Sequence, residues 1–93
     1  MANRVHTLKI LKDYADSIIF GDKNFEVRYN DRGFQKGDIV KFKVIDKRTG
    51  LSKAHEIENH HYEITYVLGS FVGLAPDYVA FGIKEQDLRE SGE

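Results

Sequence analysis

The sequence has no cysteine among its 93 residues. A disulfide, a thiolate zinc site and a cysteine nucleophile are therefore all excluded. No apolar run approaches the roughly 20 residues that a membrane-spanning helix needs. The first ten residues, MANRVHTLKI, contain no apolar core long enough for a signal peptide. We therefore expect a cytoplasmic protein without a membrane partner.

A large net charge is also missing, because the formal charge is -1 at pH 7. The charges are nevertheless unevenly distributed. Residues 1–53 hold 12 Lys/Arg and 7 Asp/Glu, a balance of +5, and residues 54–93 hold 2 Lys/Arg and 8 Asp/Glu, a balance of -6. This asymmetry is compatible with a basic patch for a polyanion, and equally with two halves that attract each other. The lack of a long basic run argues against strong sequence-independent RNA binding, which grows with the number of phosphates neutralised.

The length, without internal repeats or low-complexity linkers, predicts one domain over residues 1–93. A chain of this size buries roughly 65% of its unfolded surface, which is enough to fold without cross-links. Polar residues dominate 85–93, so we expect a frayed tail there.

Hydrophobic periodicity predicts one helix and five strands. Apolar residues recur at helical spacing over LKDYADSIIFG, and Gly21 stands where a left-handed C-cap favours glycine. Apolar runs bounded by turn signals predict strands at 5–10, 24–30, 39–46, 62–70 and 77–83. The pattern predicts an α+β, mainly β fold, and closure into a small barrel would remove exposed strand edges.

The strand predicted at 24–30 alternates strictly between apolar and polar residues. Phe25, Val27 and Tyr29 share one face, on which we expect core packing. Glu26 and Arg28 share the other face, which we expect to point away from the core. Successive side chains on one face lie about 6.6 Å apart, so long polar side chains can converge on one ligand.

Lys23, in the turn before this strand, joins Glu26 and Arg28 as a candidate binding set. Arginine offers a planar fork for a phosphate or a base edge, and lysine offers a point charge. Glu26 can accept a hydrogen bond from an exocyclic amine or a hydroxyl, or hold a neighbouring cation in place. The alternative is a solvated ion-pair ladder worth about 0–1 kcal/mol.

Four segments carry a resemblance to a known family: HTLKI, GDKNFEVRYNDRGFQKGD, ITYVL and GLAPDYVAFGI. Over roughly residues 6–84 the chain resembles ASCH domains, in particular a small bacterial and phage branch of uncharacterised function. The most specific part is the Gly-x-Lys-x-x-Glu-x-Arg run with the Gly-Asp turn that follows it. The resemblance implies a PUA-like fold, a small β-barrel with helices at its openings. It also implies a cleft that binds RNA or processes RNA and nucleotides.

One ASCH branch acts as a small amidohydrolase on acetylated cytidine, with a Lys, a Thr three positions on and a Glu from a later strand. By resemblance Lys23 matches the Lys, but Glu26 stands in the Thr position. A carboxylate does not easily replace a hydroxyl nucleophile. Glu63 is the nearest candidate for the later Glu. Another chemistry stays open, in which Lys23 and Glu26 act as a general acid–base pair on a nucleotide or RNA bond.

Three histidines lie within seven residues, at His55, His60 and His61, and are flanked by Glu56 and Glu58. Such residues can bind a divalent metal. Adjacent His60 and His61 would point to opposite faces of a strand, so they cannot both serve one site there. We expect a polar surface loop here, and no metal or other cofactor.

Three further cationic or titratable residues are candidates near the cleft, and two of them, His6 and Lys9, have two interpretations each. His6 is either a buried, hydrogen-bonded histidine or a cleft residue that donates to a base or phosphate. Lys9 is either solvated or part of the cleft. Arg32 follows a polar turn, where a long cation at a cleft rim attracts phosphates.

Several tyrosines are candidates for stacking on a nucleobase. These are Tyr29, Tyr62, Tyr66 and Tyr78. We expect core packing for each of them, and Tyr78, at the start of the last strand, is the best stacking candidate.

The sequence therefore predicts a monomeric domain that binds RNA or a nucleotide in a polar cleft. The predicted site residues are Lys23, Glu26, Arg28, Arg32, His6, Lys9 and Tyr78. One alternative is a small nucleotide- or nucleoside-processing hydrolase that uses Lys23 and Glu26. Another is a protein-interaction module that uses the apolar loop 71–76, which exposure of Phe71 and Leu74 would favour and burial of both would remove.

Overall fold

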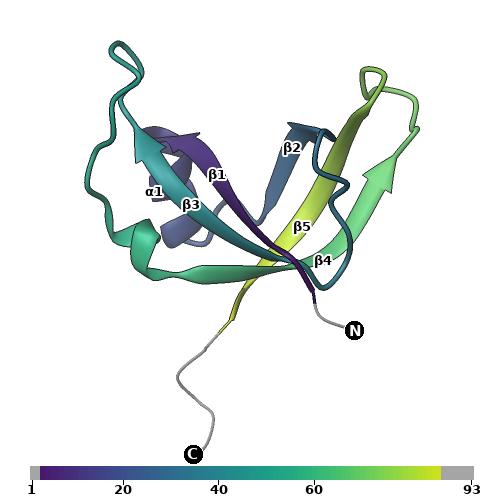
Figure 1. Ribbon diagram of the computed structural model, residues 1–93, viewed down its shortest axis with the longest axis horizontal. Helices are drawn as coiled ribbons and strands as arrows, with labels where there is room; N and C mark the ends of the chain where they lie inside the picture. Colours follow the sequence, from purple (N-terminus) through teal and green to yellow (C-terminus); the bar gives the residue numbers. More distant parts are fainter. Residues whose placement is uncertain (1–2, 87–93) are drawn as a thin grey trace, which may run out of the picture.

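The computed structural model describes residues 3–86, which form five strands, one α-helix and a short 3-10 helix (Figure 1). The strands are β1 (Val5–Leu11), β2 (Phe25–Tyr29), β3 (Ile39–Ile45), β4 (His61–Gly69) and β5 (Tyr78–Gln86). The helices are α1 (Lys12–Ile19) and η1 (Glu56–Asn59). The predicted mainly β fold is confirmed. Neither helix of this described part is long and apolar enough to cross a membrane.

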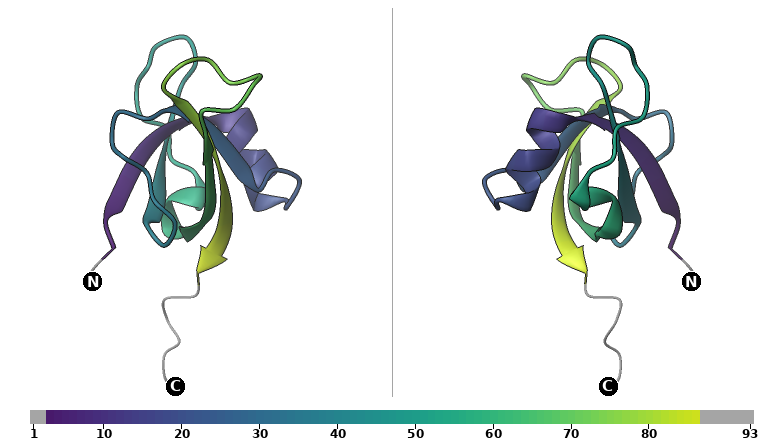
Figure 2. Two further views of the ribbon diagram at one scale, coloured as in Figure 1. Left: turned by 90° about the vertical axis from the view of Figure 1, so that its right-hand side faces the viewer. Right: turned by 90° about the vertical axis from the view of Figure 1, so that its left-hand side faces the viewer.

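The five strands form one sheet in the order β1-β3-β4-β5-β2. β1 runs parallel to β3, and the other neighbouring pairs are antiparallel. The sheet curls into a half-barrel, so that its two edge strands, β1 and β2, come near each other (Figures 1 and 2). Within residues 3–86 these two edges share no backbone ladder. The barrel predicted from the sequence is therefore left open along one seam.

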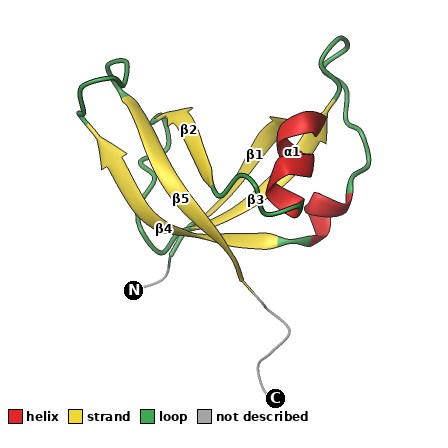
Figure 3. Ribbon diagram, turned by 180° about the vertical axis from the view of Figure 1, so that it is seen from behind, coloured by secondary structure: helices red, strands yellow, loops and turns green. Residues whose placement is uncertain are grey.

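Helix α1 follows β1 directly and packs against β1, β3 and η1 (Figure 3). It buries Ala15 and Ile18, as its apolar spacing predicts. The helix ends at Ile19, and Gly21 just beyond it has a φ of +88°, which is easiest for glycine. The Asp22 N–H donates back to the Ser17 carbonyl at 2.9 Å. Glycine at this position lets the chain turn sharply toward β2.

The core lies on the concave side of the sheet and is closed by the two helices. Its buried residues are Leu8, Ile10, Ala15, Ile18, Phe34, Val40, Phe42, Val44, Ile57, Tyr62, Ile64, Val79, Phe81 and Ile83. On β1, β3 and β5 they alternate with exposed or half-exposed residues, as expected for a sheet with one buried face.

A β-bulge at Thr65 interrupts this alternation on β4. The register with β5 shifts between Ile64 and Tyr66, so Ile64 is buried while Tyr66 is 65% exposed. The bulge depends on Gly82 across the ladder, because a Cβ there would lie 2.6 Å from the Thr65 hydroxyl oxygen. The bulge therefore separates two tyrosines of one strand, because Tyr62 is buried on the inner face and Tyr66 is exposed on the outer one.

The expected orientation of β2 is also wrong. Phe25, Val27 and Tyr29 are about half exposed, whereas Glu26 is only 4% exposed. The register pairs Glu26 with Phe81, which points inward, and this neighbour sets the inner face of the strand. The polar stripe thus lines the inside of the half-barrel at its open seam, and the apolar stripe faces solvent.

The segment expected to be a polar surface loop and the start of the segment expected to be a frayed tail both contain regular structure. The polar segment 52–61 contains η1, whose Ile57 is fully buried, so it is not simply a surface loop. Residues 85 and 86 continue β5 and are not part of a frayed tail. The rest of the predicted tail, 87–93, lies outside the described residues.

Candidate polar groove

An open groove of about 460 Å³ runs along the seam between β1 and β2. It is lined by Lys9, Ile10, Leu11, Tyr14, Lys23, Phe25, Glu26, Val27 and Arg28. Four of the seven predicted site residues are among these: Lys9, Lys23, Glu26 and Arg28. The structure thus brings together the most specific part of the predicted site.

Glu26 is the centre of the groove's polar network. Its Oε1 accepts a hydrogen bond from Arg28 Nε at 2.9 Å, and its Oε2 accepts one from the Lys23 ammonium. Taking a carboxylate out of water is costly unless cations compensate for it. The two contacts supply that compensation, so Glu26 fixes Lys23 and Arg28 beside the groove.

The Lys23 ammonium lies between polar and aromatic partners. It donates to the Phe25 carbonyl oxygen at 2.7 Å. It also lies 5.1 Å from the ring centroid of Phe25 and 5.7 Å from that of Tyr14. Both rings are about half exposed. The cation therefore stands beside two aromatic rings that solvent, or a ligand, can reach.

Arginines bridge the seam where the backbone ladder is missing. The guanidinium of Arg28 donates to the Lys9 carbonyl at 2.9 Å, and that of Arg32 donates to the Thr7 carbonyl at 2.9 Å. Edge-strand carbonyls need hydrogen-bond partners, and charged donors make strong ones. Arg28 and Arg32 therefore hold β2 and its following turn against β1. The sequence could not reveal this, because the acceptors are backbone atoms.

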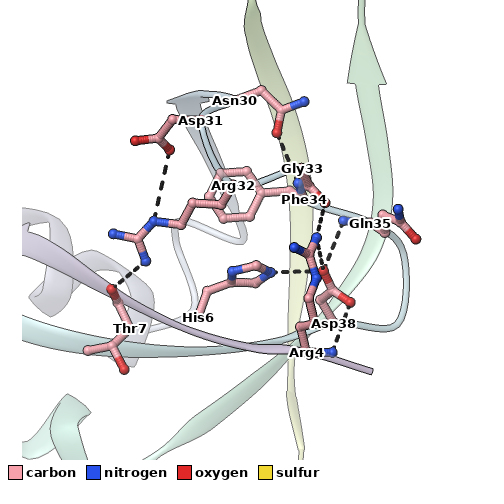
Figure 4. A network of polar contacts seen from close by, with 10 residues as sticks. All are labelled: Arg4, His6, Thr7, Asn30, Asp31, Arg32, Gly33, Phe34, Gln35 and Asp38. Atoms are coloured by element: carbon pink, nitrogen blue, oxygen red, sulfur yellow. Dashed lines mark hydrogen bonds and ion pairs between the residues drawn. The ribbon is translucent and has the colours of Figure 1, made fainter. Parts of the chain in front are cut away.

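His6 belongs to a separate buried cluster in which Asp38 is the hub (Figure 4). His6 is 5% exposed, and its Nε2 donates to Asp38 Oδ2 at 2.8 Å. Burial opposes ionisation of Asp38. Even so, hydrogen bonds from His6 and from the backbone N–H groups of Arg4 and Gln35 keep the pKa of Asp38 below its usual 3.8. This is the buried, hydrogen-bonded interpretation of His6, and the cluster fastens the 30–38 turn to β1.

The three histidines near η1 are divided among different partners. The Ile57 N–H donates to His55 Nδ1 at 3.0 Å, so His55 Nε2 carries the proton that it donates to Asp16 at 2.7 Å. His60 contacts Glu85 and, at 3.4 Å, Glu56. No group of three or more such side chains is placed to hold a metal ion in residues 3–86.

The hydrogen bond between His60 and Glu85 raises the pKa of His60 above its usual 6.5. The partial burial of the imidazole opposes this change but does not outweigh it. His60 is thus more readily protonated in the folded chain than in the unfolded one.

A basic cleft of about 340 Å³, which was not predicted as a site, adjoins the groove and shares Leu11 and Tyr14 with it. Its charged lining residues are Lys12, Lys47, Arg48, Lys53, Asp13 and Asp46. The Asp46 carboxylate belongs to the turn itself, since it accepts hydrogen bonds from the backbone N–H groups of Arg48 and Thr49. The positive charge balance of residues 1–53 was the only feature of the sequence that pointed to this cleft. The sequence does not show that these particular cations lie together in the folded chain.

The tyrosines are mostly exposed, so the expectation of core packing is confirmed for Tyr62 and wrong for the others. Tyr29, Tyr66 and Tyr78 are 53%, 65% and 39% exposed. Tyr78 contacts Tyr29 edge to face, with ring centroids 5.6 Å apart, and is not part of the groove. In the apolar loop 71–76, Phe71 is 53% exposed and Leu74 is half-buried, so the exposure expected for a protein-interaction loop is met at Phe71 and only in part at Leu74.

These features define a small, mainly β domain with a half-barrel sheet and a polar groove at its seam. The chain belongs to the family described as "Domain of unknown function (DUF3850)", which matches residues 5–83. A search of the curated proteins found no match to the chain. The family description assigns no activity, so the function has to be inferred from the groove.

Proposed function

We propose that this protein binds RNA or a nucleotide in the groove between β1 and β2. The observation that carries the proposal is the fixed Lys23–Glu26–Arg28 network beside two half-exposed aromatic rings. Two cations and one carboxylate leave a net positive charge, and Lys9 on the same lining adds to it. An anionic ligand with an aromatic part matches both properties.

Each group of the groove has a role in this proposal. The rings of Tyr14 and Phe25 stack on a nucleobase, which is worth about 1–3 kcal/mol per base. Lys23 and Arg28 contact phosphate or a base edge. Glu26 orients both cations, because both of its oxygens already accept hydrogen bonds from them.

The basic cleft favours an RNA strand over a free nucleotide. It adjoins the groove at Tyr14, so a strand with one base at Tyr14 would place neighbouring phosphates near Lys47, Arg48 and Lys53. Phosphate contacts of this kind supply much of the affinity for a nucleic acid. As part of the same proposal, we infer that the chain is related to bacterial and phage ASCH domains, which have a PUA-like fold. We also infer that the protein is cytoplasmic.

Fluorescence anisotropy with a short labelled single-stranded RNA tests this function. We expect saturable binding that Tyr14→Ala weakens about tenfold, because a stacking ring is lost. The matched control is Phe20→Ala, which removes a 76% exposed ring next to α1 that does not line the groove. Equal affinities of the two variants, or no binding by the wild-type protein, would contradict the proposal.

A second candidate is a small hydrolase of nucleotides or nucleosides, supported by the direct contact of Lys23 with Glu26. Such a pair can move a proton between a substrate and water. Incubation with acetylated cytidine and with short RNA, followed by chromatography of the products, tests it. Turnover by the wild-type protein that is lost in Glu26→Gln would favour the hydrolase. Substrates that stay intact would exclude this hydrolase activity and leave binding as the remaining proposal.

A further inference from the structure

The outer face of β2, β5 and β4 carries exposed apolar side chains in register. Phe25 on β2 stands opposite Gly82, which stands opposite Tyr66 on β4. Directly opposed residues of an antiparallel sheet point to the same side. One row along, Val27, Ala80 and Leu68 are aligned in the same way. We call this surface the aromatic face; its exposed members are Phe25, Val27, Tyr29, Tyr66 and Tyr78.

The aromatic face is lowest at Ala80, whose small side chain stands between Val27 and Leu68. On either side of Ala80 along β5, the Thr65 hydroxyl lies over Gly82, and Tyr78 carries a large ring. Two facing sheets pack about 10 Å apart with interdigitated side chains. A ring of one copy can therefore sit over Ala80 of another.

We propose that two copies of this chain form a symmetric dimer by packing their aromatic faces against each other. The exposed area supports this occupant. Its four aromatic residues and Val27 are 39% to 65% exposed. At about 200 Å² per aromatic residue, the face presents roughly 450 Å² of apolar surface. Two copies together contribute roughly 900 Å² of apolar surface, about three quarters of the roughly 1,200 Å² at the lower end of stable interfaces, and the polar rim would have to supply the rest.

The charges around the aromatic face also favour a second copy. No Lys, Arg, Asp or Glu stands in the two aligned rows, and the next row pairs Glu63 with Lys84. A two-fold contact brings a patch against itself, which suits an uncharged patch and would penalise a patch of one sign. Beyond the rows, Lys23 lies 5.1 Å from the Phe25 ring at one end, and Asp31 and Asp77 line a hollow with Tyr29 and Tyr78 at the other, so the rim carries both signs.

The aromatic face and the groove share two residues, Phe25 and Val27. Glu26 and Arg28 point to the opposite side of β2 from these two, because successive residues of a strand alternate. Face-to-face packing therefore covers part of the groove's rim and leaves the contact between Glu26 and Arg28 outside the interface. Tyr66 does not line the groove, so Tyr66→Arg tests dimerisation separately from ligand binding.

Sedimentation velocity from about 5 to about 500 μM protein covers the affinities expected for such an interface. We expect the mass to rise toward twice the 10.7 kDa of one chain. Tyr66→Arg should raise the dimer dissociation constant about tenfold or more, because a charge replaces a central ring. Leu51→Arg is the matched control, since Leu51 is similarly exposed at 68% but lies in the loop after β3, outside the three strands of the aromatic face. An unfolded Tyr66→Arg would be recognised by its circular dichroism and replaced by Tyr66→Ser.

The lack of cysteine allows a second, independent test. A single Tyr66→Cys should form a disulfide-linked or bismaleimide-linked dimer much faster than a single Leu51→Cys under the same conditions. A monomer at every concentration, or dimerisation that is equally strong in Tyr66→Arg, would overturn the proposal. The first of these results would assign the aromatic face to a different protein.

Discussion

Glu26 shows how a single residue can organise a site. Its carboxylate is almost fully buried, and it faces the inside of the half-barrel because β5 pairs it with an inward-pointing phenylalanine. Its spacing from Lys23 and Arg28 is readable in the sequence, and the three side chains are in contact in the folded chain. Its burial was not, because the register with β5 is set by residues more than fifty positions away.

Replacement of Glu26 tests this organising role. Glu26→Ala leaves the partly buried Lys23 and Arg28 without their shared anion, so we expect the free energy of unfolding to fall by about 2–4 kcal/mol. Glu63→Ala, on β4, is the control and should change it by less than about 0.5 kcal/mol. Urea denaturation measures both. A loss at Glu26 as small as that at Glu63 would mean that the network contributes little.

His60 gives the stability a pH dependence whose sign follows from its raised pKa. Protonated His60 is favoured in the folded state, so its contribution is present below pH 6.5 and disappears as the pH rises through the folded-state pKa. We expect less than about 1 kcal/mol, because Glu85 is largely exposed. Denaturation curves of wild type and His60→Gln should differ below pH 6.5 and converge at higher pH. A difference that grows with pH would have the wrong sign.

At the scale of elements, periodicity was sufficient for the helix and for all five strands. Periodicity failed to predict which face of a strand is buried where the pairing with a neighbouring strand decides this. The bulge at Thr65 reverses the inward and outward positions on β4, and the pairing with β5 turns the apolar side of β2 outward. A period of two indicates that a strand has two faces, but only its neighbours decide which face is buried.

The open seam is an element-scale feature that can be tested by removing one bridge. Arg32→Ala deletes a charged hydrogen bond to the Thr7 carbonyl, and we expect a loss of about 1–2 kcal/mol of stability. Hydrogen exchange should accelerate first in β1 and β2. Arg48→Ala, which removes an arginine that lines the basic cleft but not the groove, should leave exchange in these strands unchanged. Equal acceleration throughout the sheet would contradict a local bridge.

At the scale of the whole molecule, the fold gathers the positive charges of residues 1–53. Lys9 stands opposite Lys43 across β1 and β3, and the basic cleft lies where these strands end. The asymmetry was evident in the sequence, which left open whether the two halves attract each other or form a patch. Only the folded chain shows which cations share a surface.

This gathering of charge predicts a salt dependence of RNA binding. For a strand long enough to reach the basic cleft, replacing Lys47, Arg48 and Lys53 by Gln should reduce the slope of log affinity against log salt by about 2. Changing Lys36 and Lys84, which line neither the groove nor the cleft, to Gln should change it little. Fluorescence anisotropy at several salt concentrations measures the slope. An unchanged slope in the cleft variant would exclude phosphate contacts there.

Binding of a nucleotide or RNA in the groove beside Lys23, Glu26 and Arg28 can be tested residue by residue. An NMR shift titration of labelled protein at low salt would use short mixed-sequence RNA first, then nucleotides and modified nucleosides. We expect saturable shifts around Tyr14 and residues 23–28, which Lys23→Met weakens and the matched Lys84→Met does not. Shifts confined to other surfaces, or none with any ligand, would contradict binding in the groove and reduce the network to a structural ion pair.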